Sequence, residues 1–234
     1  MRSERELENP YLRRGARPLR LVQFTRSFHL GGTETQVLEL LRGLSSRCHT
    51  QVCVLQAGGH LLEGVRALGH APEAFPLNGS LLQANTALQV GRLARWLRRQ
   101  QVELVHVHDF YSTVLAVPAC RLAGVKVVVG RLDLSHWQGP ARSTVQAQLT
   151  ALADHVVANA EAVRNHLVAH EHLPAERVSV IPNGLDLSRF DALAAAGLQA
   201  PLPQLRGEPV VVHVANMSHP VKRHEDLLQA LGVL

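Results

Sequence analysis

Short, valine-rich segments alternate with helical patterns along most of the chain, and this alternation constrains the fold more than any other feature. Several of these segments lack a strict apolar–polar alternation, which is typical of strands that are covered on both faces. Strands that alternate with helices require right-handed crossovers, so the sequence predicts an α/β fold, a Rossmann-like parallel sheet with helices on both faces. The predicted strands are Leu19–Thr25, Thr50–Leu55, Glu73–Leu77, Glu103–His108, Lys126–Gly130, His155–Asn159, Arg177–Ile181 and Val210–Val214.

Two of the intervening segments show a clear helical period. In Thr35–Leu44, four apolar residues fall on one stripe, namely Val37, Leu38, Leu41 and Leu44. In Leu81–Arg99, the residues predicted to be buried are Leu88, Leu93, Trp96 and Leu97, whereas Arg92, Arg95 and Arg99 lie on another face. An arginine face of this kind is usually solvated, and the alternative is peripheral contact with an anionic membrane.

The alternation of predicted strands and helices stops near residue 182, and this change divides the chain. Pro182-Asn183-Gly184 is a turn signal, and an alanine-rich stretch with several prolines follows it. We therefore predict a loose basic leader over 1–18, a Rossmann-like domain over 19–182, a linker over 183–208, and the first βα unit of a second Rossmann-like domain over 209–234.

Composition excludes several classes of protein. With 46% hydrophobic residues the chain can bury a core, and with 4% aromatic residues it offers few stacking platforms, so its net charge of +5 does not indicate nucleic-acid binding. No apolar run approaches the ~20 residues of a membrane span, and the first residues do not resemble a signal peptide. Three cysteines without metal-ligand spacing favour a reduced, cytoplasmic setting.

Ligands of parallel sheets gather at the carboxyl ends of the strands, so the loops that follow the strands are the candidate sites. The first loop holds Gly31 and Gly32, which permit positive φ and a close approach of a ligand to the backbone. Thr33 can cap the following helix, whose free N–H groups favour an anion. The simpler interpretation is a tight turn with a capped helix.

The next candidates follow the mid-domain strands. His108 can turn toward the cleft and donate to a sugar hydroxyl or act as an acid or base, while His106 is expected to pack under a helix. A metal site would need Asp109 or Asp133 as a third ligand, and nothing in the spacing fixes that geometry. Arg131 can clamp a charged substrate group, or it can pair with Asp133 or Asp109 and shape the loop.

The last candidate is Lys222, which precedes a helical pattern after the apolar run at 209–214. A helix N-terminus supplies unsatisfied N–H groups and a partial positive charge, and a lysine just before the helix adds a full positive charge. This pattern is a recurrent way to hold a diphosphate.

Together these segments resemble glycosyltransferase family 4, whose members have the GT-B fold. The resemblance covers nearly everything after residue 18. The matching pieces are Gly31-Gly32-Thr33-Glu34, Val105-His106-Val107-His108-Asp109, Ala153-Asp154-His155-Val156-Val157-Ala158-Asn159-Ala160-Glu161-Ala162-Val163, Val180-Ile181-Pro182-Asn183-Gly184-Leu185-Asp186-Leu187-Ser188-Arg189-Phe190, and Val214-Ala215-Asn216-Met217 through Lys222 and Leu228.

The resemblance implies a retaining transfer of a hexose from a nucleotide-sugar, such as a UDP- or GDP-hexose, to a glycan or lipid-linked acceptor, without a metal or another cofactor. The acceptor would bind mainly the N-terminal domain. The loop of Gly31, Gly32 and Thr33, together with Asp109 and Arg131, would contact donor or acceptor. His108 would meet the transferred sugar, and Lys222 would neutralise the leaving diphosphate.

The chain departs from the family pattern in its last segment. Asn216 stands where many members have arginine, so Lys222 would act with less help. The family's Glu-x7-Glu segment would come after residue 234, so we expect a truncated copy that is weakly active or inactive alone. Two alternatives stay open, a non-catalytic GT-B-derived binding module or partner subunit, and a sugar-nucleotide epimerase.

Overall fold

The computed structural model describes residues 17–44, 48–77, 83–134, 139–197, 210–215 and 222–233. The chain divides into two compact units, with the boundary between Leu185 and Asp186. Most of the predicted leader and part of the predicted linker lie outside the described residues, and so does Asn216.

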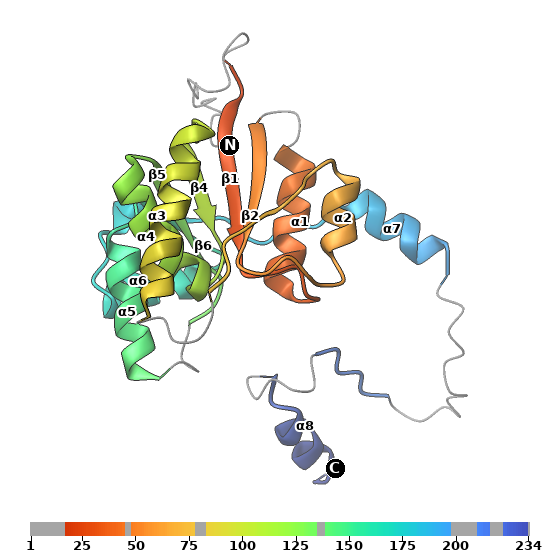
Figure 1. Ribbon diagram of the computed structural model, residues 1–234. Coiled ribbons are helices and arrows are strands. Elements are labelled where there is room, and N and C mark those ends of the chain that lie inside the picture. The colour runs from red at the N-terminus through yellow and green to blue at the C-terminus, as the bar shows by residue number, and fades with distance from the viewer. Residues whose placement is uncertain are drawn as a thin grey trace, which may run out of the picture. The chain divides into compact units, whose positions relative to one another are not determined.

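The first unit is built on a seven-stranded sheet in the order β3-β2-β1-β4-β5-β6-β7, and all six pairings are parallel (Figure 1). The predicted fold class is therefore confirmed. Because β1 lies between β2 and β4, the order of the strands reverses there, and this is the switch point of the sheet. The strands are β1 (Leu19–Thr25), β2 (Cys48–Val54), β3 (Glu73–Ala74), β4 (Leu104–Val107), β5 (Lys126–Arg131), β6 (His155–Ala158) and β7 (Val178–Val180).

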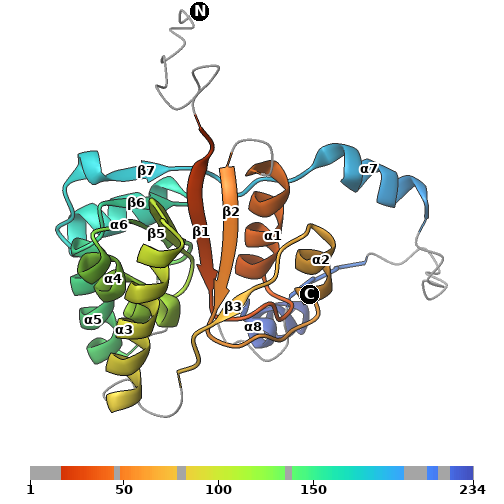
Figure 2. The ribbon, with the colours of Figure 1, turned by 45° about the horizontal axis from the view of Figure 1, so that its top comes forward.

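Helices cover the two faces of the sheet (Figure 2). On one face α1 (Gly32–Leu44) and α2 (Leu62–Ala67) pack on Val52 and Val54 of β2. On the other face the main core packs α3 (Ala84–Arg99) and α4 (Phe110–Ala123) against β1, β4 and β5. Along the same face lie α5 (Pro140–Ala151) and α6 (Glu161–His170), and the short 3-10 helix η2 (Ala175–Arg177) precedes β7.

Two details of the sequence prediction are wrong in this unit. The third strand contains only Glu73 and Ala74, because Pro76 has no N–H to continue the ladder at this edge. Leu88 is 62% exposed, whereas Gln89 is buried. The inward stripe of α3 runs through Gln89, Leu93 and Leu97 at intervals of four residues, and Leu88 lies about 100° away from that stripe.

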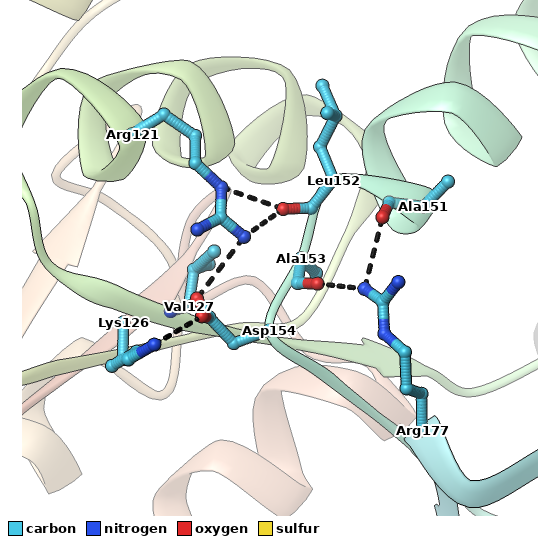
Figure 3. Close-up of polar contacts among 8 residues, drawn as sticks. All are labelled: Arg121, Lys126, Val127, Ala151, Leu152, Ala153, Asp154 and Arg177. Atoms are coloured by element: carbon cyan, nitrogen blue, oxygen red, sulfur yellow. Dashed lines mark hydrogen bonds and ion pairs between the residues drawn. The ribbon is translucent and has the colours of Figure 1, made fainter. Parts of the chain in front are cut away.

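A polar cluster holds the amino edge of the sheet together (Figure 3). Asp154, just before β6, accepts hydrogen bonds from Lys126 Nζ and from the Val127 N–H, both at 2.9 Å, and lies 3.3 Å from Arg121. Arg121 also donates to the Leu152 carbonyl, and Arg177 donates to the carbonyls of Ala151 and Ala153. The start of β5, the end of α4 and the turn before β6 are thereby joined at one point.

The chain leaves the first unit beside α1. Gln36 of α1 donates from Nε2 to the Gly184 carbonyl at 3.1 Å, and its Oε1 accepts from the Gly184 N–H at 3.0 Å. This reciprocal pair fixes the segment that follows β7 against the first unit.

The second unit contributes α7 (Leu187–Ala195) and α8 (His224–Leu231). The predicted strand at Val210–Val214 is wrong, because those residues have no strand assignment and their valines are between 50% and 91% exposed. A strand is held by the hydrogen bonds of a neighbouring strand, and the described residues of this unit contain no other strand. Within the described residues of both units, no helix is long and apolar enough to cross a bilayer.

Candidate functional site

A cavity of about 240 Å³ opens at the carboxyl edge of the sheet, where three strand–helix connections meet. The connections follow β1, β4 and β5, so the cavity lies at the switch point of the strand order. The structure therefore brings together the three loops that the sequence indicated as candidate sites. The lining residues are Arg26, Thr33, Glu34, His108, Asp109, Phe110, Tyr111, Gly130, Arg131, Leu132, Asp133 and Gln146.

The glycine loop places the N-terminus of α1 at this cavity. The helix begins at Gly32, and the Gly31 carbonyl accepts from the Thr35 N–H at 3.0 Å and from Thr35 Oγ1 at 2.8 Å. Thr33 lies in the first turn, so the prediction that it caps the helix is wrong. Neither Gly31 nor Gly32 uses the positive φ that a glycine permits, because the glycines of the described chain with positive φ are at other positions.

What the paired glycines provide is space. A Cβ built on Gly32 meets nothing within 4 Å, whereas one built on Gly31 comes within 2.4 Å of Glu34 Oε2. The N–H groups in the first turn of a helix have no carbonyl within the helix to accept their hydrogen bonds. The open backbone of Gly32 therefore lets a ligand approach donors that carry the positive end of the helix dipole.

Glu34, in the same first turn, is a lining residue to which the sequence analysis assigned no role of its own. Burial raises the pKa of its carboxyl and the charge of Asp109 adds to the effect, while a backbone hydrogen bond and the charges of His29 and Arg26 oppose it. A carboxylate at the wall of a small cavity can accept hydrogen bonds from hydroxyl groups. The sequence feature that could have indicated Glu34 as a site residue is its position two residues after the paired glycines.

His108 lines the cavity but is nearly buried, with 5% of its surface exposed. Its Nε2 lies 2.6 Å from Gln23 Oε1, and the centre of its ring lies 4.0 Å from that of His106, with the two rings tilted by 50°. Burial lowers the pKa of His108 well below its ordinary value, with a further contribution from His106, and lowers the pKa of His106 to about 4. His108 is therefore neutral at neutral pH. With Gln23 Oε1 as the acceptor, Nε2 carries the proton, and Nδ1 is the atom that can accept from a hydroxyl.

Asp109 is occupied by the protein itself. It caps α4 by accepting from the Ser112 N–H at 2.9 Å and from Ser112 Oγ at 2.7 Å. It also accepts from the Arg26 N–H at 2.7 Å, which ties the end of β1 to the start of α4. Asp109 thus holds two loops in place. It also lines the cavity, and its contact with donor or acceptor stays a prediction.

Arg131 has a partner within the protein that the sequence analysis did not name. Its side chain is only 2% exposed and forms a bidentate ion pair with Glu171, with Nη1–Oε2 and Nη2–Oε1 distances of 2.8 and 2.7 Å. Glu171 is the C-cap of α6 and was not among the expected partners. The guanidinium group that was predicted to bind a substrate group is thus paired with a carboxylate of the protein. Through this pair, Arg131 joins the end of β5 to α6.

The last two candidates lie elsewhere in the chain. Lys222 belongs to the second unit, where it is exposed and precedes α8, and Asn216 lies outside the described residues. Their roles at a diphosphate stay predictions. In the described part of the chain, no three His, Cys, Asp or Glu side chains are grouped to hold a metal ion.

Comparison with known proteins gives a consistent result. Residues 30–189 match the model of Glycosyltransferase Family 4. The chain is 25% identical to the putative glycosyltransferase EpsF of Bacillus subtilis over 90% of its own length and 57% of EpsF. It is 29% identical to the D-inositol 3-phosphate glycosyltransferase of Nocardia farcinica over 56% of its own length and 32% of that protein. The chain thus spans between a third and somewhat more than half of these relatives.

Among solved structures, the Anabaena protein Alr3699/HepE in complex with UDP matches with a TM-score of 0.62 at 19% identity, over 74% of this chain and 46% of that one. Another crystal structure of the same protein contains UDP-glucose and matches with a TM-score of 0.60 at 20% identity, over 72% and 45% of the two chains. At this level of identity the likeness concerns the fold.

Proposed function

The chain belongs to glycosyltransferase family 4, and we propose that its first unit binds the acceptor in the transfer of a hexose from a nucleotide-sugar with retention at the anomeric carbon. The observation that carries this proposal is the cavity at the switch point, where an open helix N-terminus, a carboxylate and a neutral imidazole face the same space. The UDP complexes of the structurally similar Anabaena protein support a UDP-hexose as the donor.

The cavity suits an acceptor with several hydroxyl groups. His108 Nδ1 and the Glu34 carboxylate accept from hydroxyls. Both side chains have a partner in the protein, Gln23 for His108 and its own backbone N–H for Glu34. Such fixed groups orient a nucleophile without reorganising during the reaction. D-inositol 3-phosphate, from which the Nocardia farcinica relative takes its name, is a molecule of this kind, polyhydroxylated and small.

The leaving group requires a cation. When the bond between the anomeric carbon and the diphosphate breaks, the diphosphate oxygen takes the electron pair and gains negative charge. The acceptor oxygen bonds to the same carbon, and its proton passes to the departing diphosphate oxygen. We assign Lys222 to this developing charge. This assignment places donor-binding residues in the segment that begins at residue 209.

The test is a transfer assay with a panel of UDP- and GDP-hexoses and polyhydroxylated acceptors. We expect weak transfer from at least one pair, with the configuration of the donor retained in the product's NMR coupling constants. Lys222→Ala lowers kcat about 10²–10³-fold, the range for loss of one charge-stabilising group, and His108→Ala raises KM more than it lowers kcat.

The control for this assay is Arg95→Ala, which removes an exposed charge from α3 on the outside of the first unit. Its kinetics should equal those of the wild type. Inversion of configuration, or full activity of Lys222→Ala, would contradict the proposal. Binding of acceptor and nucleotide-sugar without any transfer would favour the alternative of a non-catalytic binding module.

A further inference from the structure

Gln23 lies in the middle of β1, where a buried strand of a parallel sheet normally carries an apolar side chain. It is fully buried, and its Oε1 lies 2.6 Å from Nε2 of His108, which lines the cavity. We propose that Gln23 and Gly130 together make His108 a hydrogen-bond acceptor that is open to the ligand, so that the cavity selects a free hydroxyl group of a sugar or polyol. This inference rests on the proposed function and names the residues that determine its specificity. Neither Gln23 nor Gly130 was a candidate in the sequence analysis.

The burial of Gln23 requires an explanation of its own. A glutamine amide is unfavourable inside a protein unless both of its polar atoms are hydrogen-bonded. Among the described residues, no acceptor lies within hydrogen-bond distance of Gln23 Nε2. Apolar side chains are accepted at the neighbouring positions, since Leu21 lies two residues earlier on β1 and Val52 lies opposite Gln23 on β2, and both are buried. A glutamine with half of its amide unsatisfied is therefore explained by the group that its oxygen holds.

That group is the imidazole ring of His108. Burial lowers the pKa of His108 well below its ordinary value, with a further contribution from His106, so the ring carries one proton at neutral pH. An amide oxygen can only accept, so Gln23 Oε1 keeps this proton on Nε2 and leaves the lone pair of Nδ1 for a ligand. The centre of the His106 ring lies 4.0 Å from that of His108 and restricts its rotation. Gln23 is thus a positioning residue that acts through His108.

Gly130 on β5 leaves the approach to this lone pair open. It lines the cavity together with His108. A Cβ at this position would lie 3.7 Å from His108 Nδ1, 3.5 Å from His106 Nε2 and 3.1 Å from the Val107 carbonyl oxygen. Its φ is not positive, so the backbone conformation does not require a glycine here. The absence of a side chain is therefore explained by the space that it leaves beside Nδ1.

These two residues determine which group of a ligand fits. A lone pair on Nδ1 binds a hydroxyl, which donates, and rejects an ether or carbonyl oxygen, which has no proton to give. A hydroxyl is neutral and needs no opposite charge, and it therefore suits a neutral imidazole. The hydroxyl belongs either to the acceptor or to the hexose of the donor, and the chemistry of its recognition is the same in both cases.

The tautomer of His108 is measured by ¹⁵N NMR of protein labelled at histidine, because protonated and unprotonated ring nitrogens have well-separated resonances. The loss of signals in His108→Gln identifies those of His108. We expect the proton on Nε2 in the wild type, and a mixture of both tautomers in Gln23→Met, whose side chain has a similar length and cannot accept. A proton on Nδ1 in the wild type, or an unchanged tautomer in Gln23→Met, overturns the inference.

The matched control for Gln23→Met is Gln89→Met. Gln89 is also a buried glutamine, and it lies on α3 and is not among the residues that line the cavity. Its replacement should leave the His108 signals as in the wild type. Circular dichroism and Tm establish that each variant is folded, and the wild-type spectrum decides the position of the proton even where a variant is unstable.

Gln23→Glu is the conservative variant, because a carboxylate also accepts from Nε2. An adjacent carboxylate raises the pKa of a histidine, and below that pKa Nδ1 carries a proton and cannot accept. The transfer rate of Gln23→Glu relative to the wild type should therefore rise with pH and approach one as the ring becomes neutral, whereas Gln23→Met recovers at no pH. The other titratable or charged groups around this ring are common to both proteins, so their effects cancel in the comparison; they are His106, Arg26, Glu34, Asp109, Arg131 and Asp133. A ratio that does not change with pH overturns the positioning role of Gln23.

Gly130→Ala tests the selection of the hydroxyl. The acceptor that gives transfer is compared with its monodeoxy and mono-O-methyl analogues, and the donor with the same analogues of its hexose. In the wild type, the loss or methylation of one hydroxyl should lower kcat/KM about tenfold or more, and the set that contains this hydroxyl identifies its source. In Gly130→Ala this difference should disappear, while the proton of His108 stays on Nε2. A difference that persists overturns the role of Gly130.

The matched control for Gly130→Ala is Gly64→Ala. A Cβ on Gly64 also meets a close neighbour, Leu38 Cδ2 at 3.3 Å, but Gly64 lies on α2 and does not line the cavity. Its replacement should leave the preference for the free hydroxyl unchanged.

The NMR measurement needs no substrate and therefore separates this inference from the proposed function. A proton held on Nε2 by Gln23 in a protein without any hexose transfer leaves the positioning role intact and rejects the proposed function. Hexose transfer by a protein whose His108 carries its proton on Nδ1 rejects the inference and leaves the proposed function intact.

Discussion

At the scale of single residues, the position of a side chain in the sequence did not reveal its partner. Arg131 ends β5 at the carboxyl edge, where a substrate-binding arginine is expected, but its long side chain reaches Glu171 on α6. The pair is largely out of solvent, with side-chain exposures of 2% and 13%. A buried pair of this kind is costly to break, because removal of one partner leaves the other charged and uncompensated.

We expect Glu171→Gln to lower the free energy of unfolding by about 3 kcal/mol. The matched control in the same helix is Glu161→Gln, whose carboxylate is 71% exposed and 3.9 Å from Arg164, so its loss costs about 0–1 kcal/mol. Urea unfolding measures both. The double change Arg131→Met and Glu171→Leu should recover most of the loss. Equal effects of the two single variants would mean that the Arg131–Glu171 pair contributes no more than an exposed ion pair.

The neighbouring rings of His106 and His108 predict a dependence of stability on pH. Burial lowers the pKa of His106 to about 4 and that of His108 well below its ordinary value, so the unfolded chain, with histidine pKa values of about 6.5, takes up protons first as the pH falls. The stability contributed by the neutral rings is complete above about pH 6.5 and declines from there toward pH 4. Urea midpoints should fall in this window, less steeply in His106→Gln. A midpoint that rises there would contradict the burial of both rings.

At the scale of helices and strands, the sequence predicted what is determined locally. The strand at Leu19–Thr25 was predicted with its observed ends, because Pro18 precedes it and the polar Arg26 follows its apolar residues. The buried face of α3 was predicted wrongly. Leu88 and Gln89 are adjacent in the sequence, and which of the two is buried depends on how the helix packs against the sheet and α4. The strand predicted at Val210–Val214 is wrong because a valine-rich segment forms a strand only beside another strand. The sequence of the segment does not reveal whether such a neighbour is present.

The turn between α5 and β6 carries a prediction at this scale. Partial burial raises the pKa of Asp154, but hydrogen bonds from the Val127 N–H and Lys126, with the charges of Arg121 and Lys126, outweigh burial and lower it below its ordinary value. The ionised carboxylate therefore stabilises the fold above about pH 4, and this contribution is lost as the pH falls through the lowered pKa.

Asp154→Asn should cost about 1.5–3 kcal/mol at pH 7, the range for a hydrogen bond to a charged group, and the difference from wild type should shrink below pH 4. Lys126→Ala removes only a lysine that is 72% exposed, and should cost about 0–1 kcal/mol. Thermal or urea unfolding at several pH values tests both. A loss in Asp154→Asn that is constant from pH 7 to pH 2 would exclude an effect of charge.

At the scale of the whole molecule, the reversal of strand order at β1 and β4 positions the site. The rule that ligands gather where such a sheet reverses its order directed attention to the loops after residues 25, 107 and 131, and these loops surround one cavity. The contacts of Tyr111 with Arg26 and Arg142 were not predictable in the same way. Arg26 follows β1, whereas Tyr111 and Arg142 lie in α4 and α5, so these contacts exist only once the sheet has formed.

The central claim is that the open end of α1 is a binding surface, and two glycines of this helix test it most directly. A Cβ on Gly32 and a Cβ on Gly43 both meet nothing within 4 Å, and an alanine within a helix is more stable than a glycine by about 0.5–1 kcal/mol. Gly32→Ala and Gly43→Ala should therefore both fold with a Tm equal to or above that of wild type. The measurement is hexose transfer from the nucleotide-sugar panel by both variants. We predict a loss of about tenfold or more in kcat/KM for Gly32→Ala alone, because its methyl group covers the helix N–H donors. Equal transfer by the two variants would contradict the claim.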